Sequence, residues 1–167
     1  MTTQLSERVL LVKPGEGEDI DGTIIKVRAA LLGDDFSIME AAIEPKQLLA
    51  PHMHEREDQA VFVITGELEF EVGGEDGIRF TAPAGSYVVK PRGVAHTFWN
   101  LKSETARYIE LSGRANFEGF VEDSEDTPAL WTTIKAKPKY GITFFPHRIP
   151  KLMKDHGLTS VVGVGDD

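Results

Sequence analysis

Short runs of apolar and β-branched residues, separated by glycine, proline and acidic residues, make up most of residues 9–112. In residues 67–72, Leu68, Phe70 and Val72 alternate with glutamates. Because side chains alternate across a strand, this pattern predicts one buried and one wet face. Further strands are predicted at residues 9–13, 23–32, 36–43, 60–65, 78–81, 86–90, 95–99 and 106–111. So many short strands at this spacing favour an all-β barrel or sandwich.

The composition changes after Gly113, where three segments are predicted as short helices: residues 116–121, 128–137 and 150–156. Pro128 suits the first turn of a helix, and Thr127 before it can cap that helix. Residues 140–146 are too apolar for a loose tail and are expected to pack on the barrel or on a second subunit. We expect one domain over residues 1–167, with the barrel core at about 20–112 and a helical extension at about 114–157.

The composition excludes several kinds of site and partner. The chain has no cysteine, so any bound metal must be held by nitrogen and oxygen ligands. Its formal charge of −9 argues against a nucleic-acid partner, which requires a clustered basic face. No apolar run approaches the ~18 residues of a membrane span, and residues 1–16 lack a signal-peptide core. We therefore expect a cytoplasmic protein without a membrane or nucleic-acid partner.

Three of the five histidines fall in two short blocks that together indicate a metal site. His52 and His54 lie two residues apart, so on a strand they project from the same face. His96 follows the turn residues 91–93 and can complete the cluster from another strand. Gln59 lies five positions after His54, which is the opposite face of a continuous strand. It can join the cluster only if the charged residues 55–58 bend the chain.

The two blocks resemble the paired sequence motifs of the cupin superfamily. The second motif, G-x5-P-x-G-x2-H-x3-N, is matched at every specified position by Gly85, Pro91, Gly93, His96 and Asn100. The first, G-x5-H-x-H-x3,4-E-x6-G, is matched by His52, His54 and the closing Gly66. It departs at Lys46, which stands in place of the opening glycine, and at Gln59, which stands in place of the usual glutamate ligand. The segment as a whole is similar to single-domain cupins of the quercetin 2,3-dioxygenase-like group.

This resemblance implies a double-stranded β-helix, also called a jelly-roll or cupin barrel, with short C-terminal helices. It implies a divalent transition metal, Mn, Fe, Co, Ni or Zn, with His52, His54, Gln59 and His96 as its candidate ligands. It also implies a small-molecule substrate and a homodimer.

Gln59 changes the chemistry that the resemblance implies. An amide binds through a neutral carbonyl oxygen, so a bound divalent ion would keep its full charge and act as a stronger Lewis acid. An amide also cannot accept the proton of a substrate hydroxyl, the role given to the glutamate in quercetinase-like enzymes. Glu57 and Asp58 are expected to be solvent-exposed turn residues. Glu40 either faces the cavity, as a catalytic residue or as a hydrogen-bond partner of a metal-bound histidine, or points outward.

Three functions remain open from the sequence. The first is a metal-dependent oxygenase, quercetinase-like, in which Gln59 is a candidate catalytic residue. The second is a non-redox isomerase or lyase that uses the metal as a Lewis acid, although no basic cluster adjoins the motifs to hold a phosphate. The third is a non-catalytic small-molecule-binding cupin.

Overall fold

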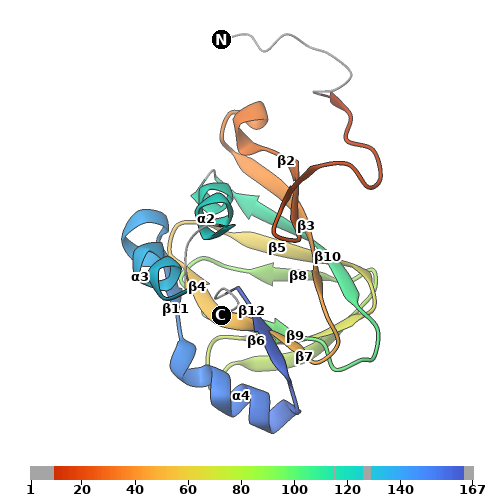
Figure 1. The fold of residues 1–167 in the computed structure, drawn as a ribbon, viewed down its shortest axis with the longest axis vertical. Coiled ribbons are helices and arrows are strands. Elements are labelled where there is room, and N and C mark those ends of the chain that lie inside the picture. Colours follow the sequence, from red (N-terminus) through yellow and green to blue (C-terminus); the bar gives the residue numbers. More distant parts are fainter. Residues whose placement is uncertain (1–9, 115, 126–128, 164–167) are drawn as a thin grey trace.

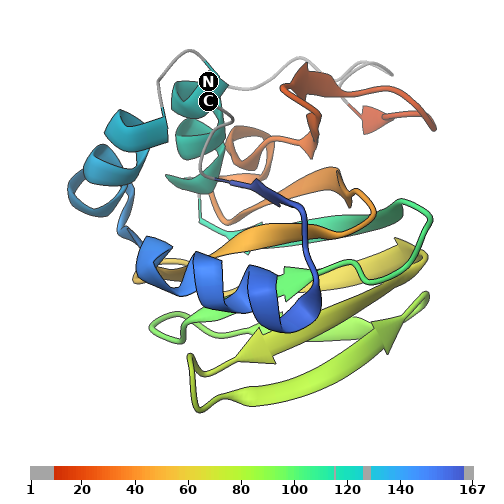
Figure 2. The same ribbon diagram turned by 60° about the horizontal axis from the view of Figure 1, so that its bottom comes forward.

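The computed structural model describes residues 10–114, 116–125 and 129–163, and most of its regular structure is β-strand. Two sheets stack on each other, and three α-helices lie beside them (Figures 1 and 2). The two sheets are named sheet A and sheet B. In spatial order, sheet A contains β1 (Glu18–Ile20), β2 (Thr23–Val27), β3 (Phe36–Ile43), β10 (Ala106–Gly113), β5 (Gln59–Thr65) and β8 (Tyr87–Lys90). Sheet B contains β11 (Ile142–Phe144), β4 (Gln47–His54), β9 (His96–Trp99), β6 (Glu67–Val72) and β7 (Ile78–Pro83), and β12 (Ser160–Val162) pairs with β4.

The chain crosses between the two sheets repeatedly. It passes from β4 in sheet B to β5 in sheet A, returns to β6, and later runs from β7 to β8, β9 and β10 with a crossing at each step. This path is that of a double-stranded β-helix, and it confirms the predicted all-β fold with short C-terminal helices. The crossings bring β4 and β5, which are consecutive in sequence, onto opposite walls of one interior.

Between residues 18 and 162 the described helical elements are η1 (Ala29–Leu32), α2 (Asn116–Glu125), α3 (Ala129–Tyr140), η2 (Pro146–Arg148) and α4 (Ile149–His156). The three predicted helical segments are confirmed, except that Thr127 and Pro128 lie outside the described residues. The apolar segment at 140–146 packs on the barrel, because β11 extends sheet B beside β4. Within the described residues, no helix is long and apolar enough to cross a membrane.

The alternating pattern predicted for β6 is confirmed on its apolar face, where Leu68 and Phe70 are fully buried. The opposite face, predicted to contact water, is not entirely accessible, because Glu71 is also fully buried. Arg79 and Arg148 both form ion pairs with its carboxylate, at 2.7 and 2.5 Å, which is the condition under which a charge can be buried.

Two strand predictions needed correction. Residues 10–13 form no strand, and Leu10 and Leu11 are exposed, while Val9 lies outside the described residues. The predicted strand at 23–32 ends at Val27, and η1 follows it, because Gly33 has a φ of 69° and closes the turn with a left-handed residue.

Candidate metal centre and adjoining cavity

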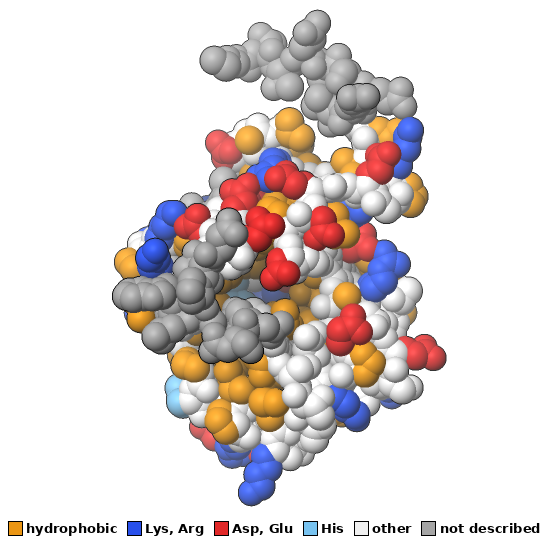
Figure 3. Space-filling model, viewed as in Figure 1, with side chains coloured by type: hydrophobic (Ala, Val, Ile, Leu, Met, Phe, Trp, Pro, Cys, Tyr) orange, Lys and Arg blue, Asp and Glu red, His pale blue; other side chains and the backbone are white. Residues whose placement is uncertain are grey.

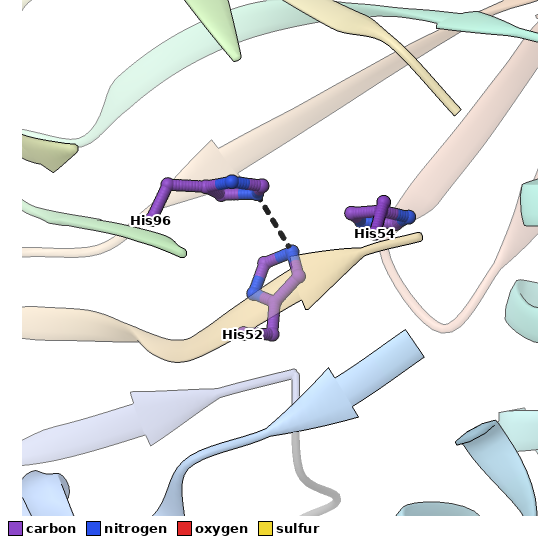
Figure 4. Close-up of side chains that lie close together, drawn as sticks. All are labelled: His52, His54 and His96. Carbon is purple, nitrogen blue, oxygen red and sulfur yellow. Dashed lines mark hydrogen bonds between the residues drawn. The ribbon is translucent and has the colours of Figure 1, made fainter. Parts of the chain in front are cut away.

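Sheet B brings the three motif histidines together. His52 and His54 share the inward face of β4, and His96 is the direct register partner of His52 on β9. All three are buried, with exposed fractions of 6%, 1% and 2%. Their rings point toward one another from the two strands (Figure 4). The structure thus places the nitrogen ligands as the i, i+2 spacing predicts.

Each imidazole is oriented by a hydrogen bond at Nδ1. His52 Nδ1 lies 2.8 Å from the Ala50 carbonyl oxygen, His96 Nδ1 lies 3.1 Å from that of Val94, and His54 Nδ1 lies 3.1 Å from Glu57 Oε2. Since carbonyl and carboxylate oxygens only accept, each Nδ1 carries the proton and each Nε2 carries a lone pair. Such partners fix the tautomer and direction of metal-binding histidines.

The three Nε2 lone pairs converge on one point. The Nε2 atoms of His52 and His96 are 3.1 Å apart, and one nitrogen from each of the three rings lies within 4.8 Å of the other two. His54 Nε2 is buried without a hydrogen-bond partner among the described residues. Lone pairs that face each other at this distance repel, and a cation between them removes the repulsion. The donor set therefore fits a divalent transition metal, which binds neutral imidazole nitrogen readily.

Burial keeps these imidazoles neutral. It lowers the pKa of His54 to about 3, with a further contribution from the positive charge of Lys90. Burial also lowers the pKa values of His52 and His96 well below the ordinary value, and the neighbouring histidines and Lys90 act in the same direction. No protons then compete with a metal at neutral pH.

Glu57 is a part of the site that sequence reasoning missed. It was expected in solvent, but it is fully buried and binds His54 through Oε2, while its Oε1 has no hydrogen-bond partner among the described residues. Burial raises the pKa of Glu57 to about 7. The neighbouring Asp58 does lie at the surface, paired with Arg92. In the sequence, the sign of this contact is that Glu57 follows His54 by three residues, just after the strand ends.

Gln59 reaches the interior from the opposite sheet. The chain bends after His54, as that placement requires, and β5 begins at Gln59 on the inward face of sheet A. Gln59 is 4% exposed and lines the same cavity as His52. Its Nε2 donates to Ser112 Oγ at 3.2 Å, and its Oε1 is buried without a hydrogen-bond partner among the described residues. A carbonyl oxygen is thus free to accept from a ligand or to bind a cation.

The cavity beside the histidines has a volume of about 300 Å³. Its walls are mostly apolar, with Met39 and Phe144 among them, and Phe117 and Phe120 of α2 cover one side. Phe117 and Phe144 also contact the rings of His54 and His52. Figure 3 shows the hollow from outside, with acidic side chains gathered above it. This volume is at the lower end of the range of small-molecule sites.

A buried ion pair, which sequence patterns do not predict, also lines this cavity. Lys90 of β8 and Glu110 of β10 are 2% and 6% exposed, and Lys90 Nζ donates to Glu110 Oε2 at 2.7 Å. Glu110 shares the buried face of β10 with Ala106, Tyr108 and Ser112, and a single acidic residue on such a face does not by itself indicate a site. Burial raises the pKa of Glu110, although Lys90 opposes that shift.

Glu40 is not brought to the site. Its carboxylate forms ion pairs with Lys26 and Arg107, and it is not among the described residues that line the cavity. Its neighbour Met39, one position away on β3, does line the cavity, so Glu40 belongs to the outward face.

The backbone of the two motifs holds the site together. The Gly93 N–H donates to the carbonyl oxygen of His54 at 2.7 Å, from a turn in which Gly93 has a φ of 74°. Lys46, in place of the motif's first glycine, has a φ of 60°, a conformation that glycine adopts without a steric penalty. Its backbone N–H donates to Asn100, and its Nζ to Leu101. The Asn100 side chain donates to the carbonyl oxygens of Ile43, at the end of β3, and Glu104, and it accepts from the Lys102 N–H.

This fold and site define a β-barrel with a three-histidine centre that can bind a metal ion. Residues 39–112 match the family model described as Cupin domain. The matched segment runs from β3 to β10 and contains all three histidines, and over this segment the chain is similar to cupin domains. No curated protein sequence matches the chain.

Several solved structures share the fold. A proposed sugar phosphate isomerase from Acidithiobacillus ferrooxidans is 21% identical with a TM-score of 0.53, over 66% of this chain and 79% of that one. KdgF from a Halomonas species is 22% identical with a TM-score of 0.51, over 64% and 94%. An oxalate decarboxylase from Lactobacillus farciminis is 16% identical with a TM-score of 0.51, over 60% of this chain and 31% of that one. At these identities the likeness concerns the fold alone.

Proposed function

We propose that this chain is a metal-dependent enzyme acting on a small organic substrate, and that its reaction is an oxygenation of the quercetin dioxygenase-like kind. The observation that carries the proposal is the convergence of three neutral Nε2 atoms beside a cavity of about 300 Å³. His52, His54 and His96 would hold the ion, and Gln59 is the candidate fourth ligand. When bound, Mn, Fe, Co or Ni would supply Lewis acidity toward a substrate oxygen and a redox-active centre for dioxygen chemistry.

The chain's own residues contribute binding and exclusion of water. The apolar walls, with Phe117, Phe120 and Phe144, suit an aromatic or other ring-sized substrate and would displace water from beside the histidines. The third function, a non-catalytic small-molecule-binding cupin, would gain support if the cavity were too small for a ring-sized ligand, and a volume of about 300 Å³ does not provide that support.

A dioxygen-consumption assay tests the proposal. The metal-free chain would be reconstituted separately with Mn, Fe, Co and Ni and supplied with flavonols and β-diketones. We expect oxygen uptake with at least one metal, abolished in His96→Ala and retained in His147→Ala, which alters an exposed histidine. Absence of uptake with every metal and substrate would count against oxygenation.

A non-redox isomerase or lyase is the second candidate, and the buried Lys90–Glu110 pair favours it. A carboxylate and an ammonium group in one cavity can exchange protons with a substrate. Among the described lining residues Lys90 is the one Lys or Arg, and Glu110 neutralises it, so a phosphorylated substrate is not favoured. Turnover with Zn²⁺, which has no redox chemistry, would support this candidate over the oxygenase.

The homodimer remains a proposal from the resemblance. Sedimentation at micromolar concentration would show a species of about twice 18.4 kDa if it is right, and one of 18.4 kDa if it is wrong.

A further inference from the structure

The presence of Gln59 in place of a glutamate leaves the proposed enzyme without a base at that position. A substrate that carries a hydroxyl group must lose its proton if its oxygen is to react as an anion, and an amide side chain cannot take it up. Among the described residues, the groups that line the cavity and can carry a charge are His52, Asp21, Glu44, Lys90, Tyr108 and Glu110.

Most of these groups are unsuited to accept the proton. Asp21 and Glu44 are exposed, so they lie at the solvent end of the cavity. His52 directs its Nε2 at the other histidines. Burial, followed by the negative charge of Glu110, raises the pKa of Tyr108, so its hydroxyl stays protonated. Glu110 is the remaining buried acceptor.

Glu110 is held by one oxygen and open at the other. Its Oε2 accepts from Lys90 Nζ at 2.7 Å. Its Oε1 is buried and has no hydrogen-bond partner among the described residues. An unpartnered carboxylate oxygen inside a protein is costly, which makes it a site for a hydrogen-bond donor from a ligand. On the neighbouring strand, Gln59 Oε1 is a second unpartnered oxygen on the same wall.

The ion pair itself is not explained by the fold. A buried pair gives little net stability compared with an apolar pair of similar volume, because both charges lose their hydration. The neighbouring inward positions on sheet A, Val61 and Val88, are apolar. A Lys–Glu pair among apolar residues at the cavity wall departs from what a stable core requires, and such departures are typical of functional positions.

We propose that Glu110 accepts the proton of a substrate hydroxyl, with Lys90 as its positioning residue, and that the substrate is an acidic hydroxyl compound such as an enol or a catechol. This inference rests on the proposed function. In the step, the substrate O–H bond breaks, the proton forms an O–H bond with Glu110 Oε1, and the electron pair stays on the substrate oxygen. Lys90 keeps its proton and charge. The net charge of the cavity is therefore unchanged, and Lys90 faces the new anion instead of a carboxylate.

The test uses 4-nitrocatechol as a probe with the zinc-loaded chain, in which no redox turnover occurs. The visible absorption of the probe shows whether its hydroxyl is ionised when bound. Calorimetry in buffers of different ionisation enthalpy gives the number of protons released to solvent. We expect the wild type to bind the ionised probe with almost no proton released, because Glu110 keeps the proton.

The variant Glu110→Gln should bind the ionised probe only with release of about one proton to the buffer. Below the pKa of the free probe, the affinity of Glu110→Gln for the probe should fall, relative to the wild type, about tenfold for each unit by which the pH is lowered. The double variant Lys90→Gln/Glu110→Gln removes the unpaired lysine and should behave in the same way. Glu40→Gln, on an adjacent strand but the outward face, should match the wild type. Zinc content is measured for each and should not change.

Two outcomes would overturn the inference and are distinguishable. Equal proton release by the wild type and both Glu110 variants, with the ionised probe bound in each, would show that Glu110 accepts no proton and would leave the proposed metal enzyme intact. Failure of the zinc-loaded wild type to bind the probe at all would overturn this substrate class together with the oxygenase proposal.

Discussion

The two walls of the cavity are built for different chemistry. On sheet B, three neutral imidazoles are each fixed at Nδ1 by an acceptor, and their Nε2 lone pairs meet. On sheet A, the cavity wall carries the Lys90–Glu110 ion pair, and Glu110 Oε1 and Gln59 Oε1 are buried without hydrogen-bond partners among the described residues. The donors of the first wall suit a cation, and the free acceptors of the second wall suit a hydrogen-bond donor. Metal binding and proton exchange can therefore be separated by mutation.

The largest expected effect is loss of the metal from sheet B. His96→Ala removes one of three converging nitrogens, and the remaining pair should not retain an ion through dialysis, so metal content should fall from about one per chain to background. Elemental analysis measures this directly. His147→Ala should keep full occupancy. Equal metal content in both variants would show that the cluster is not the binding site.

The next effect is on stability and concerns sheet A. Lys90→Met leaves Glu110 buried without its partner, which should lower the free energy of unfolding by about 3 kcal/mol at neutral pH. Urea denaturation in the presence of a chelator measures this without a contribution from bound metal. The double variant Lys90→Met/Glu110→Gln removes both charges of the pair and should recover most of the loss. A single variant as stable as the wild type would show that the pair is not coupled.

The same variant should show a pH dependence with a definite sign. Burial raises the pKa of Glu110 above its ordinary value of 4.5, so in the folded chain it holds its proton over a range in which the unfolded chain has lost it. The contribution of Glu110 to stability is then fully present below pH 4.5 and is lost as pH rises through the raised pKa, by at most about 1.4 kcal/mol per pH unit. Without Lys90, which opposes the shift, the fall should extend to higher pH. Lys90→Met/Glu110→Gln should lose this component.

A smaller effect on metal affinity is expected at Glu57, which orients His54 through its Nδ1. Glu57→Gln keeps an acceptor for His54 Nδ1 but removes the carboxylate, and metal affinity should fall about 10- to 100-fold. Competition with a chelator of known affinity measures the change. Asp58→Asn is the matched control, because Asp58 is the next residue but pairs with Arg92 at the surface. Equal affinities in the two variants would deny Glu57 a role at the site.

The two walls also differ in how far the sequence predicts them. The histidine wall follows from local spacing, because the period of a strand places His52 and His54 on one face and the Gly93 turn delivers His96. The structure has β3 (Phe36–Ile43) and β6 (Glu67–Val72) at the predicted bounds, and strict alternation of apolar and acidic residues indicated β6. The Lys90–Glu110 pair depends on β8 and β10 both pairing with β5, and no local pattern encodes that non-local register.

Glu57 and Glu40 illustrate the same limit in opposite directions. A charged run such as residues 55–58 is normally solvated, and only the tertiary position of His54 makes it favourable to bury Glu57. Glu40 stands in an apolar strand, yet Lys26 and Arg107 on the flanking strands pair with it on the outward face. Whether a single charged side chain is buried depends on the residues that pair with it in the fold, and sequence spacing does not identify those residues.

The smallest expected effect tests whether Gln59 of sheet A binds the metal together with the histidines of sheet B. Gln59→Glu supplies an anionic oxygen, and if this side chain reaches the metal, affinity should rise on the order of tenfold, because attraction to the ion outweighs the cost of burying the carboxylate. Ser112 can accommodate the change, since its hydroxyl donates as well as accepts. Gln59→Leu should lower the affinity by a similar factor. If chelator competition finds both variants unchanged, Gln59 acts only on the substrate side, and the metal is held by sheet B alone.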